Sequence, residues 1–172
     1  MISRRSFLIG GAGVTLVGGA VAIETIGPRK VLHEVGLLID AELGASLPRA
    51  VIGWSMGGYG ALHLAARHPT AFRAAVAASP ALWHSFDEAS PGAFDDEADF
   101  GRNDIFADRA EMADIVVRVD CGTDDGFVDA ARDFADGLPN PNPGSFGEGF
   151  HETPYWRSIA ADQLMTIATA LA

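Results

Sequence analysis

The order of the predicted elements indicates an α/β fold, in which helices cover both faces of a parallel sheet. Three observations carry this prediction. A short β-branched segment runs into a glycine-rich turn at residues 53–58. Two further apolar segments, Phe72–Ala78 and Ile115–Cys121, have the composition of buried strands. Segments whose apolar residues follow helical spacing lie between and after these strands. At 172 residues, with 48% hydrophobic and 20% charged, the chain has room for one such domain.

The first 22 residues have the layout of a twin-arginine export signal. Arg4 and Arg5 precede a weakly hydrophobic segment at residues 7–17, and Ala20-Val21-Ala22 supplies an A-x-A cleavage site. We therefore expect export across the bacterial inner membrane, with membrane contact only through this segment. The alternative is an uncleaved membrane anchor, although the apolar segment is shorter than the roughly 20 residues that a spanning helix needs.

Charge and cysteine content argue against a nucleic-acid-binding protein and against a domain stabilised by intramolecular disulfides. The formal net charge is −11, and removing residues 1–22 takes away two arginines and no acidic residue, which brings it to −13. A chain this acidic offers no basic face for phosphates, so we expect no nucleic-acid partner. The single cysteine, Cys121, cannot form an intramolecular disulfide, and its place in an apolar segment predicts a buried side chain.

The elements up to residue 114 are predicted as follows. Residues 23–36 form a linker, and the segment 37–47 fits a short amphipathic helix that ends near Pro48. The strand containing Val51 and Ile52 leads into the glycine-rich turn, and a helix runs from that turn to Arg67, because Pro69 forbids its continuation. Residues 82–114 are rich in acidic residues and form a polar excursion with one short helix at its end.

Beyond the strand Ile115–Cys121, the spacing predicts a helix over Phe127–Leu138 and a firm loop over residues 139–144. Ser145–Phe150 is predicted as a short glycine-rich strand, and an amphipathic helix from Pro154 closes the chain. The domain organisation that follows is a signal at 1–22, a linker with a short helix at 23–48, and the main domain at 49–172.

The glycine-rich turn has the pattern of a nucleophile elbow. It reads Gly53-Trp54-Ser55-Met56-Gly57-Gly58, with a strand before it and a helix that begins within it. Small residues are expected where a strand crosses tightly into a helix, because a Cβ has no room there. The turn would lift Ser55 clear of the sheet, so Ser55 is the candidate nucleophile.

Serine needs a base to take its proton and a carboxylate to orient that base. In folds that carry a nucleophile elbow, the acid follows a later strand and the histidine lies in a loop near the C-terminus. Asp124 and Asp125 come after the strand Ile115–Cys121, and either could turn inward. His151 follows the last predicted strand, and His84 is its competitor. The three other histidines are expected to have no catalytic role: His33 in the linker, and His63 and His68 on the elbow helix.

Residues from about Arg49 onward resemble the C-terminal part of the esterase family of α/β-hydrolases that contains esterase D (S-formylglutathione hydrolase) and the mycobacterial mycolyltransferases. The matching stretches are residues 53–61, Ser-Pro-Ala-Leu-Trp at 79–83, Cys-Gly-Thr-Asp-Asp-Gly-Phe at 121–127, and Gly-Phe-His followed by Tyr-Trp within 149–156. The resemblance implies that Ser55, Asp125 and His151 form a catalytic triad. It also implies that the backbone N–H of Met56 contributes to an oxyanion hole.

The chain departs from this family before the elbow. Family members carry the N-terminal half of the sheet there, including the loop that completes the oxyanion hole, whereas only 28 residues lie between Ala22 and Val51. We therefore expect an incomplete α/β-hydrolase fold without a second oxyanion donor, a loss that costs about 10²- to 10³-fold in rate.

The sequence thus predicts an exported serine hydrolase that cleaves a small-molecule carboxylic ester through an acyl-enzyme on Ser55. Trp54, Trp83 and Phe86 are expected to line the acyl side, and no cofactor or metal is expected. The acidic residues 87–99 lack the regular spacing of a calcium loop. Two alternatives stay open: a non-catalytic or inactive truncated remnant, and an acyltransferase that uses the same triad.

Overall fold

The computed structural model describes residues 6–10, 13–17, 37 and 48–172. The chain divides into two compact units, residues 1–48 and residues 49–172. In the first unit, β1 (Ser6–Gly10) and β2 (Gly13–Val17) pair as an antiparallel hairpin. The rest of the predicted signal, the linker and all but Leu37 of the helix predicted at 37–47 lie outside the described residues. Among the described helices, none combines the length and the apolar character needed to span a bilayer.

The second unit is built on a three-stranded parallel sheet. The strands are β3 (Ala50–Trp54), β4 (Ala74–Ala78) and β5 (Val116–Asp120), in the spatial order β3-β4-β5. The register aligns Trp54 with Ala78 and Ala78 with Asp120, so the three strands end at the same level. The predicted α/β fold is confirmed, and the loops after these strands meet at one edge of the sheet.

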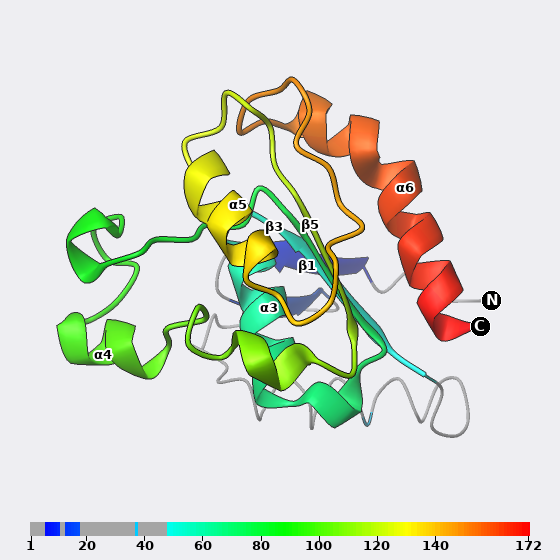
Figure 1. Cartoon of the computed structure of the whole chain (residues 1–172), viewed down its shortest axis with the longest axis horizontal. Helices are drawn as coiled ribbons and strands as arrows, with labels where there is room; N and C mark the ends of the chain where they lie inside the picture. The colour runs from blue at the N-terminus through cyan, green and yellow to red at the C-terminus, as the bar shows by residue number, and fades with distance from the viewer. Residues whose placement is uncertain (1–5, 11–12, 18–36, 38–47) are drawn as a thin grey trace. The chain divides into compact units, whose positions relative to one another are not determined.

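Helices lie on both faces of this sheet (Figure 1). The helices α3 (Met56–Arg67) and α5 (Val128–Asp136) lie on one side, and α6 (Thr153–Leu171) lies on the other. All five residues of β4 are buried, and four of them are alanines. These short side chains allow α3 and α6 to approach the central strand closely from opposite sides.

The excursion between β4 and β5 holds three short helical elements: η3 (Phe86–Glu88), α4 (Glu97–Arg102) and η4 (Arg109–Met112). The one short helix predicted at its end corresponds to η4, a single 3-10 turn, whereas α4 is an addition to the prediction. At the start of α4 the Asp96 carboxylate accepts a hydrogen bond from the Asp99 N–H at 2.7 Å. This N-cap is what starts a helix in a segment without a run of apolar residues.

The strand predicted at Ser145–Phe150 is wrong. The segment does run beside the chain that follows β5, where its carbonyls accept hydrogen bonds from the N–H groups of Cys121 (3.2 Å), Thr123 (2.9 Å) and Asp124 (3.0 Å). In each of these bonds the segment is the acceptor, whereas a β-ladder requires donation in both directions. Just before this segment, the side chain of Asn142 pairs with β5 as the backbone of a neighbouring strand would. Its amide accepts from the Val119 N–H and donates to the Val119 carbonyl, each at 2.9 Å.

Candidate active site

Ser55 lies between β3 and α3 in a strained backbone conformation, with φ 53° and ψ −127°. Its N–H donates to the Ala78 carbonyl at 3.0 Å. Its carbonyl accepts from the N–H groups of Tyr59 (3.0 Å) and Ala81 (3.1 Å). Non-glycine residues with positive φ persist only where the surrounding structure holds them, and they concentrate at functional sites. The end of β4 and the first turn of α3 together hold Ser55 at the carboxyl edge of the sheet.

Gly53 explains why the strand can cross so tightly into the helix. A Cβ at this position would fall on the carbonyl group of Gly57. Any larger residue at position 53 would therefore push β3 away from the first turn of α3. The absence of a side chain at Gly53 is part of how Ser55 is placed, as the elbow pattern predicts.

The structure brings Ser55, Asp125 and His151 together. His151 Nε2 lies 2.9 Å from Ser55 Oγ, and His151 Nδ1 lies 2.9 Å from Asp125 Oδ2. The Asp125 side chain is buried, and its other carboxylate oxygen accepts the Phe127 N–H at 3.0 Å. With the carboxylate as acceptor, Nδ1 carries the imidazole proton, which leaves Nε2 to accept the hydroxyl proton of Ser55. This is the arrangement that general-base activation of a serine requires.

Two glycines let the loop of His151 lie against the loop of Asp125. A Cβ on Gly122 would collide with the carbonyl group of Gly149. Gly149 has a φ of +155°, and a Cβ there would collide with the ring of Tyr155 on α6. The close contact between the two loops therefore depends on both residues lacking a side chain.

The rivals named for the acid and the base lie elsewhere. Asp124 is exposed, so of the neighbouring pair it is Asp125 that turns inward. His84 is exposed and held by carboxylates, with its Nε2 at 3.2 Å from Asp133 Oδ2 and its Nδ1 at 3.7 Å from Glu88 Oε2. His63 is buried in α3 and stacks on Tyr59. His33, for which no catalytic role is expected, lies outside the described residues.

Met56 is the first residue of α3, and its backbone N–H therefore has no acceptor within the helix. No side chain caps this helix. The N-terminus of a helix carries partial positive charge, which favours an anion beside it. The end of α3 next to Ser55 can accordingly stabilise negative charge that develops near the hydroxyl.

The aromatic residues expected to line the acyl side have different surroundings. Trp54 is 49% exposed and stacks on Trp156 at 6.1 Å between ring centroids. Trp83 packs edge-on against Phe94 and Phe127. Phe86 is half-buried in η3. That any of them contacts an acyl group stays a prediction.

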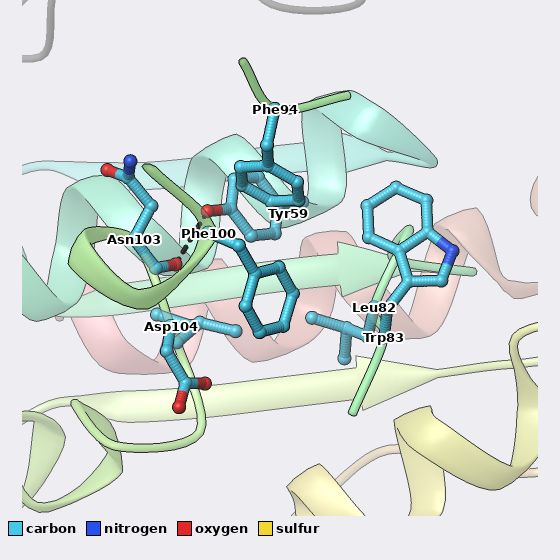
Figure 2. Close-up of a pocket in the computed structure, with 8 residues that line it drawn as sticks. Tyr59, Leu82, Trp83, Phe94, Phe100, Asn103 and Asp104 are labelled. Atoms are coloured by element: carbon cyan, nitrogen blue, oxygen red, sulfur yellow. Dashed lines mark hydrogen bonds between the residues drawn. The ribbon is translucent and has the colours of Figure 1, made fainter. Parts of the chain in front are cut away.

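Figure 2 shows the cavity beside Trp83, where the Tyr59 hydroxyl donates to the Asn103 carbonyl at 2.7 Å. Its volume is about 10 Å³, room for a single water molecule. The aromatic side chains that line this cavity therefore leave too little room in it for an acyl group.

Three features of the site have no motif in the sequence. His151 is flanked by Phe127 and Trp156, each with its ring centroid 5.2 Å from the imidazole. The Cys121 thiol is buried, and burial together with the nearby charge of Asp125 raises its pKa to about 12. The thiol is therefore protonated at neutral pH and has no nucleophilic role.

The third feature is Asp120, the last residue of β5, which has no exposed surface. Its carboxylate accepts from Arg118 Nε (2.8 Å), Arg118 Nη2 (2.9 Å) and Gln163 Nε2 (2.8 Å). It also accepts from the Ser145 N–H at 2.9 Å and the Ser145 hydroxyl at 3.3 Å. Asp120 thus joins β5, α6 and the start of the His151 loop. Alternating polar residues within an apolar strand, Arg118 and Asp120, are the signal that could have indicated it.

Residues 29–140 match the family described as "Putative esterase". A comparison with curated proteins gives no match. Among solved structures, a ferulic acid esterase superposes with a TM-score of 0.64 at 23% identity, over 81% of this chain and 60% of that one. An S-formylglutathione hydrolase from Staphylococcus aureus gives 0.65 at 20% identity, over 86% and 66%. One from Agrobacterium tumefaciens gives 0.64 at 20%, over 84% and 57%. The chain spans less than two thirds of the length of each of these structures, and the likeness confirms an incomplete α/β-hydrolase fold.

Proposed function

The chain belongs to the putative esterase family, and from this premise we propose that it is a serine hydrolase acting on small-molecule carboxylic esters through an acyl-enzyme on Ser55. One observation carries the proposal: the imidazole of His151 lies 2.9 Å from both Ser55 Oγ and Asp125 Oδ2. A serine, a base and a buried carboxylate in this geometry form the arrangement that activates a hydroxyl for acyl transfer.

In the acylation half-reaction, Ser55 Oγ attacks the ester carbonyl and its proton passes to His151 Nε2. Asp125 stays ionised and stabilises the imidazolium through the hydrogen bond at Nδ1. The carbonyl oxygen becomes an oxyanion that accepts a hydrogen bond from the Met56 N–H at the start of α3. When the tetrahedral intermediate collapses, the proton on Nε2 goes to the departing alkoxide, which leaves as an alcohol.

In the deacylation half-reaction, water replaces the alcohol. His151 Nε2 takes a proton from the water as its oxygen attacks the acyl carbonyl. When the second tetrahedral intermediate collapses, His151 Nε2 gives that proton to Ser55 Oγ, and the carboxylic acid is released. We propose the Met56 N–H as the single oxyanion donor, and we therefore expect turnover to be slower than in an enzyme with two donors, by about 10²- to 10³-fold.

Hydrolysis of p-nitrophenyl acetate and butyrate by the full chain tests the proposal. We expect release of p-nitrophenolate by the wild type and by Ser90→Ala, which changes an exposed serine, and background release by Ser55→Ala. Urea unfolding of each variant establishes that the proteins compared are folded. A folded wild type with no more activity than Ser55→Ala would favour the non-catalytic alternative, and transfer of the acyl group to an added alcohol would favour the acyltransferase.

We also propose that the chain is exported, because residues 1–22 have the twin-arginine layout. Replacing both Arg4 and Arg5 with lysine should retain the protein in the cytoplasm of a bacterial host, while the unchanged chain reaches the periplasm. Cell fractionation followed by immunoblotting measures the distribution. Equal distribution of the two forms would contradict the proposal.

A further inference from the structure

The imidazole of His151 is held by two aromatic side chains as well as by its two hydrogen bonds. Phe127 and Trp156 each lie 5.2 Å from it between ring centroids, and Trp156 meets it at an interplanar angle of 90°. The two hydrogen bonds fix the directions of the ring nitrogens. The aromatic neighbours restrict tilting of the ring out of the line between Ser55 and Asp125.

Trp156 is itself fixed by a hydrogen bond. Its indole Nε1–H donates to the hydroxyl of Ser79 at 3.0 Å. Trp156 lies in the first turn of α6, packs against a small apolar cluster that includes Tyr155 and Ile159, and stacks on Trp54. The contact with Ser79 is therefore what sets the indole at one angle within an otherwise apolar surrounding.

Ser79 has an unusual conformation for its residue type. It follows the last residue of β4, its side chain is fully buried, and its φ is +46°. In the described part of the chain only Ser55 shares a positive φ without being glycine. Glycine adopts this conformation without strain. A role for its hydroxyl would explain why serine rather than glycine occupies this position.

Two contacts of Ser79 point toward the acid of the site. Its N–H donates to the Asp120 carbonyl at 2.7 Å. Both its hydroxyl and the Asp125 carboxylate are near enough to the buried Cys121 thiol to affect the pKa of that thiol, which Asp125 raises and the Ser79 hydroxyl lowers. Ser79 is thus placed between the strand that leads to the acid and the indole that contacts the base.

We propose that Ser79 and Trp156 act as a pair of positioning residues, in which the Ser79 hydroxyl orients the Trp156 indole and the indole holds His151 in line with Ser55 and Asp125. The expected effect of this pair on kcat rests on the proposed hydrolase function. Its structural part, the coupling of Ser79 to the ring of His151, does not depend on turnover.

Ser79→Gly and Trp156→Phe separate this role from a purely structural one. Glycine relieves the positive φ, which offsets part of the cost of losing the buried hydrogen bond, so Ser79→Gly should stay folded, with a urea midpoint close to that of the wild type. Phenylalanine keeps an aromatic ring beside His151 but has no N–H to donate. We expect each variant to lower kcat about tenfold or more with little change in KM, because a small misplacement of a catalytic group is costly. Ser90→Gly, at an exposed position, is the control for the serine-to-glycine change.

The double variant decides whether the two residues act as a unit. Both single changes delete the same hydrogen bond, so the double variant should lose no more than the worse of the two. Losses that multiply, or an unchanged kcat in Ser79→Gly, would overturn the proposal.

Proton NMR of the same changes in a Ser55→Ala background gives a readout without catalysis. We expect Ser79→Gly to speed solvent exchange of the Trp156 indole N–H and to broaden the low-field resonance of His151 Nδ1–H. If both resonances are unaffected, the pair does not position His151, even in an active enzyme. If both respond while the wild type hydrolyses no ester, the proposed function fails and the positioning stands.

Discussion

Replacing Asp125 with asparagine tests how the acid orients the base. One carboxylate oxygen of Asp125 accepts the Phe127 N–H at 3.0 Å, and the other accepts from His151 Nδ1 at 2.9 Å. Asparagine has only one acceptor oxygen. When that oxygen keeps the backbone bond, the amide NH₂ faces Nδ1, which must then be the unprotonated ring nitrogen. The imidazole proton moves to Nε2, which can no longer accept the hydroxyl proton of Ser55.

We therefore expect Asp125→Asn to lower kcat for ester hydrolysis about 10⁴-fold, or about 5.5 kcal/mol of transition-state stabilisation. Asp124→Asn is the matched control, because it makes the same change on the neighbouring exposed side chain and should stay within about twofold of the wild type. The assay is initial-rate hydrolysis of p-nitrophenyl butyrate, with urea unfolding to show that both variants fold. A loss of less than about tenfold in Asp125→Asn, or equal losses in the two variants, would refute the tautomer argument.

Three further perturbations test other parts of the account. Asp120→Asn leaves the buried guanidinium of Arg118 without a counter-charge and should lower the free energy of unfolding by about 3–5 kcal/mol in urea titrations. The exposed control Asp114→Asn should change it by less than about 0.5 kcal/mol, and similar effects of the two changes would contradict the buried ion pair. Gly149→Ala places a Cβ on the ring of Tyr155 and should lower kcat about 10²-fold. Gly147→Ala places its Cβ in open space and should change kcat little, and equal rates would contradict the dependence of the His151 loop on Gly149. Burial, aided by the charge of Arg67, lowers the pKa of His63 below 6.5. As the pH falls, the unfolded chain therefore binds a proton at this histidine before the folded chain does, and stability should fall below about pH 6.5. His63→Leu should flatten the dependence of the urea midpoint on pH between 7.5 and 5.5, and an unchanged slope would contradict this expectation.

The elements around Ser55 could be predicted from sequence because local signals determine their ends. The predicted strand and helix agree with β3 and α3, since Gly53 permits the crossing and Pro69 blocks continuation of the helix. β5 and α5 also agree with their predictions to within about two residues at each end. In each case a β-branched run or a helical apolar face coincides with a glycine or proline boundary.

The remaining features depend on contacts between distant residues. The segment Ser145–Phe150 has strand-like composition, but the Asn142 side chain occupies the adjacent edge of β5. Towards the backbone that follows β5, the segment is bonded only through its carbonyls. His151 is flanked by Phe127, which immediately precedes α5, and by Trp156 on α6, two positions that are far apart in the sequence. No periodicity encodes such a contact, because it arises only when the sheet brings the loop ends together.

The central claim, that Ser55 is the activated nucleophile, is tested most directly by mapping the adduct of a fluorophosphonate probe on the full chain. We expect peptide mass spectrometry to find one adduct on Ser55, formed by the folded wild type and absent from Ser55→Ala. Folded wild-type protein that acquires no adduct, or that carries it on another residue, would contradict the claim.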